Sequence, residues 1–182
     1  GRIFKSVDLA QNIWKPIVST LNSDVKALKF FTDSEGVALV VENDIQRLKR
    51  TRDGGETWTD IASPVFTNLQ INANRDVIIA SGQDGKLALI LPYISGNDQV
   101  LSINVNVANI GDFVDAWVNK VGVGNYDLYV STADKVFYAN YSGNNSPLFS
   151  PIISSANSSI KQVVTKRIAP TSQVIAVLKQ DG

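Results

Sequence analysis

The sequence predicts an all-β fold, and three observations support this prediction. No segment keeps apolar residues at helical spacing for more than about two turns. Short runs of alternating apolar and polar residues recur instead, and Gly, Asn, Asp and Ser bound them. These runs come in sets of four, and the sets repeat at intervals of about 45 residues.

Three of these sets follow one another along the chain. The first set predicts strands over 24–31, 35–43, 44–51 and 57–61. The second set predicts strands over 66–74, 75–84, 86–94 and 99–105. The third set predicts strands over 112–121, 126–134, 135–142 and 147–152.

The two ends of the chain resemble the halves of a fourth set. Runs 159–168 and 172–179 look like its first two strands, and runs 2–9 and 12–17 look like its last two. One anchor residue in each set precedes an isoleucine by three positions: Trp14, Trp58, Val100 and Phe149. The spacings between these anchors, 44, 42 and 49 residues, support the repeat.

A four-stranded unit repeated at this interval is the sequence signature of a β-propeller, in which each unit is one antiparallel blade. A blade cannot bury both faces alone and must stack against its neighbours. We therefore expect a single propeller domain over 1–182 with about four blade equivalents. Either the N-terminal strands complete the last blade and close the ring, or these are consecutive blades of a larger propeller. A β-sandwich without repeats is the alternative fold.

The stretch TRDGGETW at 51–58 fits the pattern Ser/Thr-x-Asp-x-Gly-x-Thr-Trp through Thr51, Asp53, Gly55 and Trp58. It resembles the Asp-box, or BNR repeat, of β-propellers. The resemblance implies a structural hairpin between the third and fourth strands of a blade. Ser6, Asp8 and Trp14 form a degenerate copy that lacks the glycine.

Physical chemistry gives each residue of the 51–58 motif a structural role. An inward Asp53 carboxylate can accept several loop N–H groups that no strand pairs. Gly55 is expected at φ > 0, and Trp58 is expected to fill the wedge between adjacent blades. A catalytic or metal-binding Asp53 is the alternative.

Asp-box propellers include sialidases, xyloglucanases, sortilin/Vps10-like receptors and photosystem II assembly factors of the Ycf48 type. The chain resembles the non-catalytic Ycf48-like and sortilin-like members more than sialidases, which need three converging arginines and a Tyr nucleophile. The resemblance implies a non-catalytic scaffold that presents loops to a protein or glycan partner. A degenerate or partial glycoside hydrolase is the alternative.

Composition also argues against an enzyme. The chain has no Cys and no His, which removes thiol nucleophiles, the commonest general base and the commonest zinc ligand. We expect no catalytic residue, no cofactor and no metal. Asp112 and Asp115, near Trp117 on an expected innermost strand, are the carboxylate pair that a hydrolase would need. The linkers 32–35 and 122–125 both join a first strand to a second, so we expect them on one partner-binding face.

Charge is balanced, with 17 Lys and Arg against 17 Asp and Glu. A candidate basic patch lies at Arg47, Lys49, Arg50 and Arg52. It is either a site for phosphate or an acidic partner, or a solvated outer strand whose charges discourage edge pairing. Without interleaved aromatic residues we expect no nucleic-acid partner, and no apolar run reaches the roughly 18 residues of a membrane segment.

Three N-glycosylation sequons begin at Asn140, Asn144 and Asn157. They have meaning only in a secretory protein. An extracytoplasmic or secretory location is our expectation.

Overall fold

The computed structural model describes the chain except for residues 1–2, 9–10, 12, 22, 62–64, 73, 94–98, 144–145, 155–158, 170–171 and 180–182. The chain divides into two compact units, Gly1–Ser63 and Pro64–Gly182. Across the described residues the regular elements are β-strands, apart from one 3-10 turn, η1, at Gln83–Gly85.

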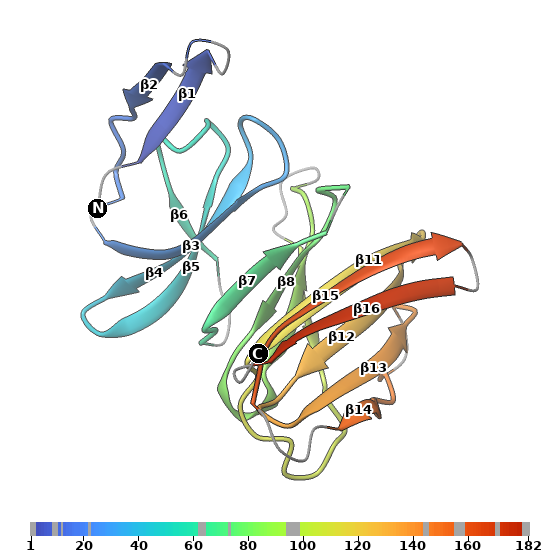
Figure 1. Ribbon diagram of the computed structural model, residues 1–182. Helices are drawn as coiled ribbons and strands as arrows, with labels where there is room; N and C mark the ends of the chain where they lie inside the picture. Colours follow the sequence, from blue (N-terminus) through green and yellow to red (C-terminus); the bar gives the residue numbers. More distant parts are fainter. Residues whose placement is uncertain are drawn as a thin grey trace. The chain divides into compact units, whose positions relative to one another are not determined.

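The first unit contains one four-stranded antiparallel sheet and one hairpin (Figure 1). The sheet has the order β3 (Asp24–Phe30), β4 (Gly36–Glu42), β5 (Ile45–Thr51) and β6 (Thr59–Ile61). The hairpin pairs β1 (Phe4–Asp8) with β2 (Ile13–Pro16). Strand β4 is a continuous apolar run and is buried on both of its faces, which is why it lies inside the sheet.

The second unit contains two four-stranded antiparallel sheets and a two-stranded one (Figure 1). One sheet comprises β7 (Asn68–Ile71), β8 (Ile78–Ser81), β9 (Leu87–Ile90) and β10 (Val100–Ile103). The next comprises β11 (Asp115–Gly122), β12 (Asn125–Ser131), β13 (Lys135–Tyr141) and β14 (Ser150–Ser154). The two-stranded sheet pairs β15 (Ile160–Ala169) with β16 (Ser172–Lys179).

Apolar side chains join neighbouring sheets of the second unit face to face. One core combines Ile79 and Leu89 with Val118 and Leu128, which come from the two four-stranded sheets. A second core joins Tyr129 and Val136 of the β11–β14 sheet to Ile160 and Val163 of β15. This stacking buries both faces of the β11–β14 sheet, as a blade requires.

The protein is therefore an all-β propeller built of four-stranded antiparallel blades, as its sequence predicts. Three blades are complete, and the predicted fourth is represented by two separate hairpins, β1–β2 and β15–β16. The β1–β2 hairpin corresponds to the predicted runs 2–9 and 12–17, and the β15–β16 hairpin corresponds to the predicted runs 159–168 and 172–179. That they complete one blade together stays a prediction.

The predicted strands 66–74 and 75–84 are both shorter than expected, the second being Ile78–Ser81, because the Asn72 side chain holds the turn between them. The run 66–74 forms a strand only at Asn68–Ile71. Beyond it, the Asn72 Oδ1 atom accepts the N–H groups of Asp76 at 3.0 Å and Val77 at 3.2 Å. Arg75 lies inside this turn at φ +55°. The asparagine thus satisfies main-chain groups that a longer strand would have paired.

Candidate functional site

The loop at 51–58, which joins β5 to β6, is held by a compact set of hydrogen bonds. The buried Thr51 hydroxyl accepts the Gly55 N–H at 2.8 Å and donates to Asp53 Oδ1 at 2.8 Å. The Asp53 carboxylate also accepts the Thr57 N–H at 2.9 Å and the Thr57 hydroxyl at 2.5 Å. Gly54 and Gly55 lie at φ +76° and +103°, where side chains are strained.

This geometry differs from the expectation for Asp53 in one respect. The Asp53 side chain is exposed and not turned inward. Its carboxylate accepts the main-chain N–H of one other residue, Thr57, where several such N–H groups were expected. The buried Thr51 hydroxyl, rather than Asp53, holds the Gly55 N–H. The Thr57 hydroxyl, followed by the Thr57 N–H, lowers the pKa of the Asp53 carboxyl from 3.8 to about 2.

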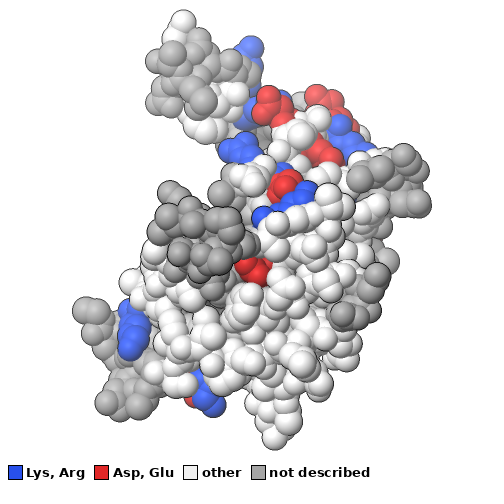
Figure 2. Space-filling view, turned by 90° about the vertical axis from the view of Figure 1, so that its right-hand side faces the viewer, with Lys and Arg blue, Asp and Glu red and all other residues white. Residues whose placement is uncertain are grey.

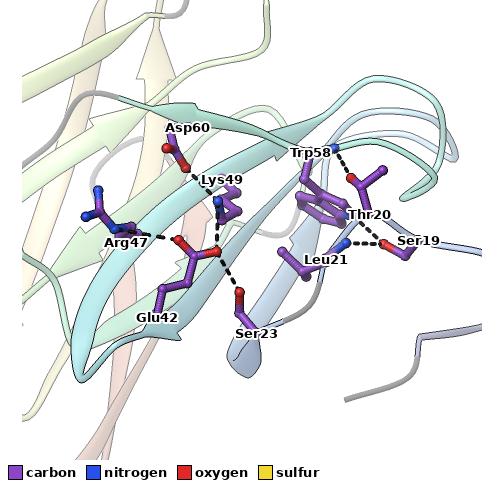
Figure 3. Close-up of polar contacts among 9 residues, drawn as sticks. All are labelled: Ser19, Thr20, Leu21, Ser23, Glu42, Arg47, Lys49, Trp58 and Asp60. Atoms are coloured by element: carbon purple, nitrogen blue, oxygen red, sulfur yellow. Dashed lines mark hydrogen bonds and ion pairs between the residues drawn. The ribbon is translucent and has the colours of Figure 1, made fainter.

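Trp58 fastens the loop to the segment that leads into β3 (Figure 3). Its Nε1 donates to the Gly55 carbonyl at 2.8 Å and to Ser19 Oγ at 3.1 Å, and its main-chain N–H donates to Thr20 Oγ1 at 3.2 Å. The indole ring lies edge-on to Phe30, with centroids 6.4 Å apart. These contacts give the loop and the segment 19–21 one common anchor.

Trp58 also contributes to an apolar core of the first unit. The core is formed by buried Leu21, Ala38 and Val40, and Ile3 packs against it beside Trp58. The Ile17 N–H donates to the Ile3 carbonyl at 2.9 Å. Trp58 thus packs against the same apolar core as Ile3, which directly precedes the β1–β2 hairpin.

An open groove of about 610 Å³ lies beside the 51–58 loop, and we call it the lysine groove. It is lined by residues of the β1–β2 hairpin, the following segment and the loop: Lys5, Lys15, Pro16, Ile17, Val18, Thr20, Glu56 and Thr57. Lys5 and Lys15 are direct cross-strand partners in the hairpin. The sequence alone does not reveal this site, because the register of β1 and β2 has to be known before the two lysines can be paired.

Hydrogen bonds to the loop fix the walls of the lysine groove. The Thr20 N–H donates to the Glu56 carbonyl at 2.9 Å, and Lys5 Nζ donates to the Asp33 carbonyl at 3.4 Å. The Gly54 N–H donates to the Ser34 carbonyl at 2.8 Å. The predicted partner-binding linker 32–35 therefore adjoins the 51–58 loop. The other linker, 122–125, is the β11–β12 turn, where Val123 is 98% exposed.

The four residues of the candidate basic patch do not form one continuous surface. Arg47 and Lys49 project from one face of β5, whereas Arg50 follows the buried Leu48 on the other face and is 1% exposed. Arg50 pairs with Glu35 and lies over the Phe31 ring at 5.9 Å. Arg52 is exposed in the loop. Strand β5 is an interior strand, since β6 pairs with its outer side, so the expectation of an outer strand is wrong.

Acidic side chains neutralise the exposed part of this patch (Figure 3). Lys49 Nζ lies 3.0 Å from Glu42 Oε1 and 2.7 Å from Asp60 Oδ1, and Arg47 Nε lies 3.6 Å from Glu42 Oε2. The Ser23 hydroxyl donates to Glu42 at 2.6 Å. Figure 2 likewise shows blue and red side chains intermixed where charged groups gather.

The pKa values of this cluster follow from its contacts. The Ser23 hydroxyl and then Lys49 lower the pKa of Glu42, and Lys49 lowers the pKa of Asp60. Burial acts to lower the pKa of Lys49, but its bonds to Asp60 and Glu42 outweigh burial and raise it. These contacts favour the charged forms of Glu42, Asp60 and Lys49, and with Arg47 the cluster contains two cations and two anions, so its net charge is zero.

The degenerate motif has a different environment. Ser6 pairs with Trp14 across the β1–β2 hairpin, and the register shifts between Ser6 and Asp8. The Asp8 side chain lies outside the described part. Trp14 is 54% exposed, in contrast to the partly buried Trp58.

The carboxylates of Asp112 and Asp115 bind different partners. Asp115 is 2% exposed, and its Oδ1 atom accepts hydrogen bonds from Asn68 at 2.8 Å and Gln70 at 3.4 Å. Its Oδ2 atom accepts the Val163 N–H at 3.0 Å. Asp115 therefore ties β11 to β7 and to β15. Asp112 is exposed and accepts the Asp84 N–H at 3.0 Å.

Among the described residues, no three His, Cys, Asp or Glu side chains are grouped so that they could hold a metal ion. No helix within the described ranges is long and apolar enough to cross a membrane.

No known family model matches this sequence, and no curated protein matches it significantly. A solved structure titled "YCF48 bound to D1 peptide" is similar to this chain with a TM-score of 0.44 and 13% sequence identity. The similarity covers 84% of this chain and 60% of that chain. The chain thus spans less than two thirds of the length of that protein.

Proposed function

We propose that this protein is a non-catalytic binding scaffold whose propeller presents the lysine groove and the adjoining loops to a protein partner. The observation that carries the proposal is the groove itself. It is concave, it is lined by two lysines and an aliphatic segment, and its walls are fixed by the 51–58 loop. A preformed site loses little conformational entropy when it binds, which favours affinity.

The contacts of the carboxylates support a scaffold over an enzyme. Glycoside hydrolysis needs two carboxyl groups that face one cleft about 5–9.5 Å apart. Asp115 is buried among partners from two other strands, and the Asp112 carboxylate binds a main-chain N–H. Asp53, Glu42 and Asp60 also bind neighbouring side chains. A degenerate or partial glycoside hydrolase remains the alternative.

A protein partner fits the groove better than a glycan does. Glycan sites commonly offer an aromatic ring for a sugar to stack on, and the residues that line the groove include no aromatic side chain. Pro16, Ile17 and Val18 offer an aliphatic wall instead. The 122–125 turn is a second candidate contributor to partner binding, because Val123 is almost fully exposed.

Membership of the Asp-box propellers is part of this proposal. It is supported by the bonds that Thr51, Asp53 and Thr57 form within the loop, and by the positive φ of Gly55. In this proposal the motif serves the scaffold by holding one wall of the groove.

An affinity experiment with charge-matched variants tests the proposal. Val18→Asp places a charge on an exposed side chain of the groove, and Asn43→Asp places the same charge in the β4–β5 turn. We expect partner proteins retained by wild type and by Asn43→Asp to be lost with Val18→Asp. Equal retention by all three would contradict the groove as the binding site.

An activity assay tests the alternative. We expect purified protein to hydrolyse neither fluorogenic sialosides nor β-glucans above background. Turnover that disappears in Asp112→Asn or Asp115→Asn would overturn the scaffold proposal in favour of an enzyme.

A further inference from the structure

The pairing of Lys5 with Lys15 is unfavourable unless something neutralises it. The two residues lie directly opposite each other in the β1–β2 hairpin, and both line the groove. Like charges at directly opposed positions of an antiparallel pair destabilise it. Within the described part of the chain, neither lysine forms an ion pair, and Lys5 Nζ contacts only a carbonyl oxygen. The groove therefore contains two ammonium groups without an ion-pair partner in the described part of the chain, and an anionic group bound there would neutralise them.

The adjoining wall is apolar and has main-chain groups to offer. Val18 is 94% exposed, although it is aliphatic and lies beside Pro16 and Ile17. The segment 17–19 is outside any strand. The Ile17 N–H and the Thr20 N–H donate to the carbonyls of Ile3 and Glu56, whereas the main-chain groups of Val18 and Ser19 have no backbone partner among the described residues. An extended peptide could pair with this segment as an added strand does.

The residues that the 51–58 loop contributes restrict the charge pattern of the occupant. Glu56 and Thr57 of the 51–58 loop also line the groove, so an acidic residue fits near the lysines and is repelled near Glu56. A hydroxyl or apolar residue suits the second position. The surface thus distinguishes one end of a bound segment from the other.

We infer that the lysine groove binds an extended acidic peptide segment, with a carboxylate between Lys5 and Lys15 and an apolar side chain on Pro16–Val18. This inference rests on the proposed function and names its partner chemistry. Lysines could also bind nucleic-acid phosphates, but the groove has no aromatic residue on which bases could stack. The aliphatic wall and the unpaired main-chain groups favour a peptide.

Phage display of random peptides tests the inference, with the intact protein as bait. Peptides of about 12 residues are used, because an extended chain of that length reaches about 40 Å. We expect selected peptides to contain Asp or Glu beside aliphatic residues. The most enriched peptide, called the winning peptide below, is then labelled with a fluorophore. Its Kd for wild type and for each variant is measured by fluorescence anisotropy.

The double variant Lys5→Gln/Lys15→Gln should bind the winning peptide about tenfold more weakly, because two surface ion pairs are lost. The affinity of wild type should fall between about 50 mM and about 300 mM salt, and that of the double variant should change little. Lys26→Gln/Lys86→Gln is the matched control, since both are exposed lysines outside the groove. It should bind like wild type.

The possible failures are distinguishable. Selected peptides that lack acids, or that bind the double variant as tightly as wild type, would overturn the groove inference and leave protein binding intact. Equal losses in the control variant would also overturn it, because they indicate a general charge effect. No selected peptide at all would count against the proposed function as well. Tighter binding of a single-stranded oligonucleotide with the same lysine dependence would replace the peptide by a nucleic acid.

Discussion

Substitution of Asp115 by alanine tests whether this carboxylate is structural. The side chain is buried, and it accepts two short hydrogen bonds, from the Asn68 amide at 2.8 Å and the Val163 N–H at 3.0 Å. Bonds to a charged group contribute about 1.5–3 kcal/mol each, and the carboxylate's own desolvation opposes this gain. We expect Asp115→Ala to lower the free energy of unfolding by about 2–4 kcal/mol.

Two further variants define this experiment. Asp115→Asn keeps one acceptor but turns an NH₂ group toward a donor, so we expect an intermediate loss of about 1–2 kcal/mol. Asp112→Ala removes an exposed carboxylate and should change the free energy by no more than about 0.5 kcal/mol. Urea unfolding followed by tryptophan fluorescence measures all three. Equal midpoints for Asp115→Ala and wild type would refute the structural role.

Three further predictions concern the first unit. The pKa of Asp53 is about 2 in the folded protein, below its ordinary 3.8, so its contribution to stability is present above about pH 4 and is lost as the pH falls toward 2. The melting temperature of wild type should therefore exceed that of Asp53→Asn near neutral pH and approach it near pH 2; a constant difference would contradict this role. Trp58→Ala should cost about 3 kcal/mol in urea unfolding and Trp58→Phe less, because phenylalanine keeps a ring in this place although it loses the Nε1 bonds and part of the packing of the larger indole; equal losses would contradict the packing argument. Deletion of residues 1–18 uncovers the core of Leu21, Ala38 and Val40, so calorimetry should show a lower, less cooperative transition and light scattering should show aggregation. A truncated monomer that melts unchanged would argue against a structural role for the N-terminal strands, including the completion of the last blade.

Short apolar runs bounded by turn residues predicted the strands, and burial has a period of two in a strand that keeps one exposed face, whereas β4 is buried on both faces. In β5, for example, Leu48 and Arg50 share a buried face, while Arg47 and Lys49 share the other. The same period could have shown that a cluster of four basic residues in sequence is divided between two faces. The strand ends were harder to predict, because Asn72 ends a strand through hydrogen bonds to its own turn.

The remaining features depend on contacts between distant parts of the chain. Asp115 binds Asn68 and Val163, which are 47 and 48 residues away. The lysine groove needs the register of β1 and β2 together with the position of the 51–58 loop. Sequence periodicity sets which face a residue occupies, whereas these sites depend on how sheets and loops pack against one another. The polar Asp115 at the start of a largely buried strand was the one visible signal.

Hydrogen–deuterium exchange with and without the winning peptide most directly tests the claim that the propeller is a binding scaffold with its site in the lysine groove. We expect slower exchange in residues 14–20 and 51–58 when the peptide is bound, because those main-chain groups become paired or covered. The interior strands β4, β8 and β12 should exchange slowly in both states, since they are buried within their blades. Protection confined to other segments, with no change in 14–20 or 51–58, would contradict the account.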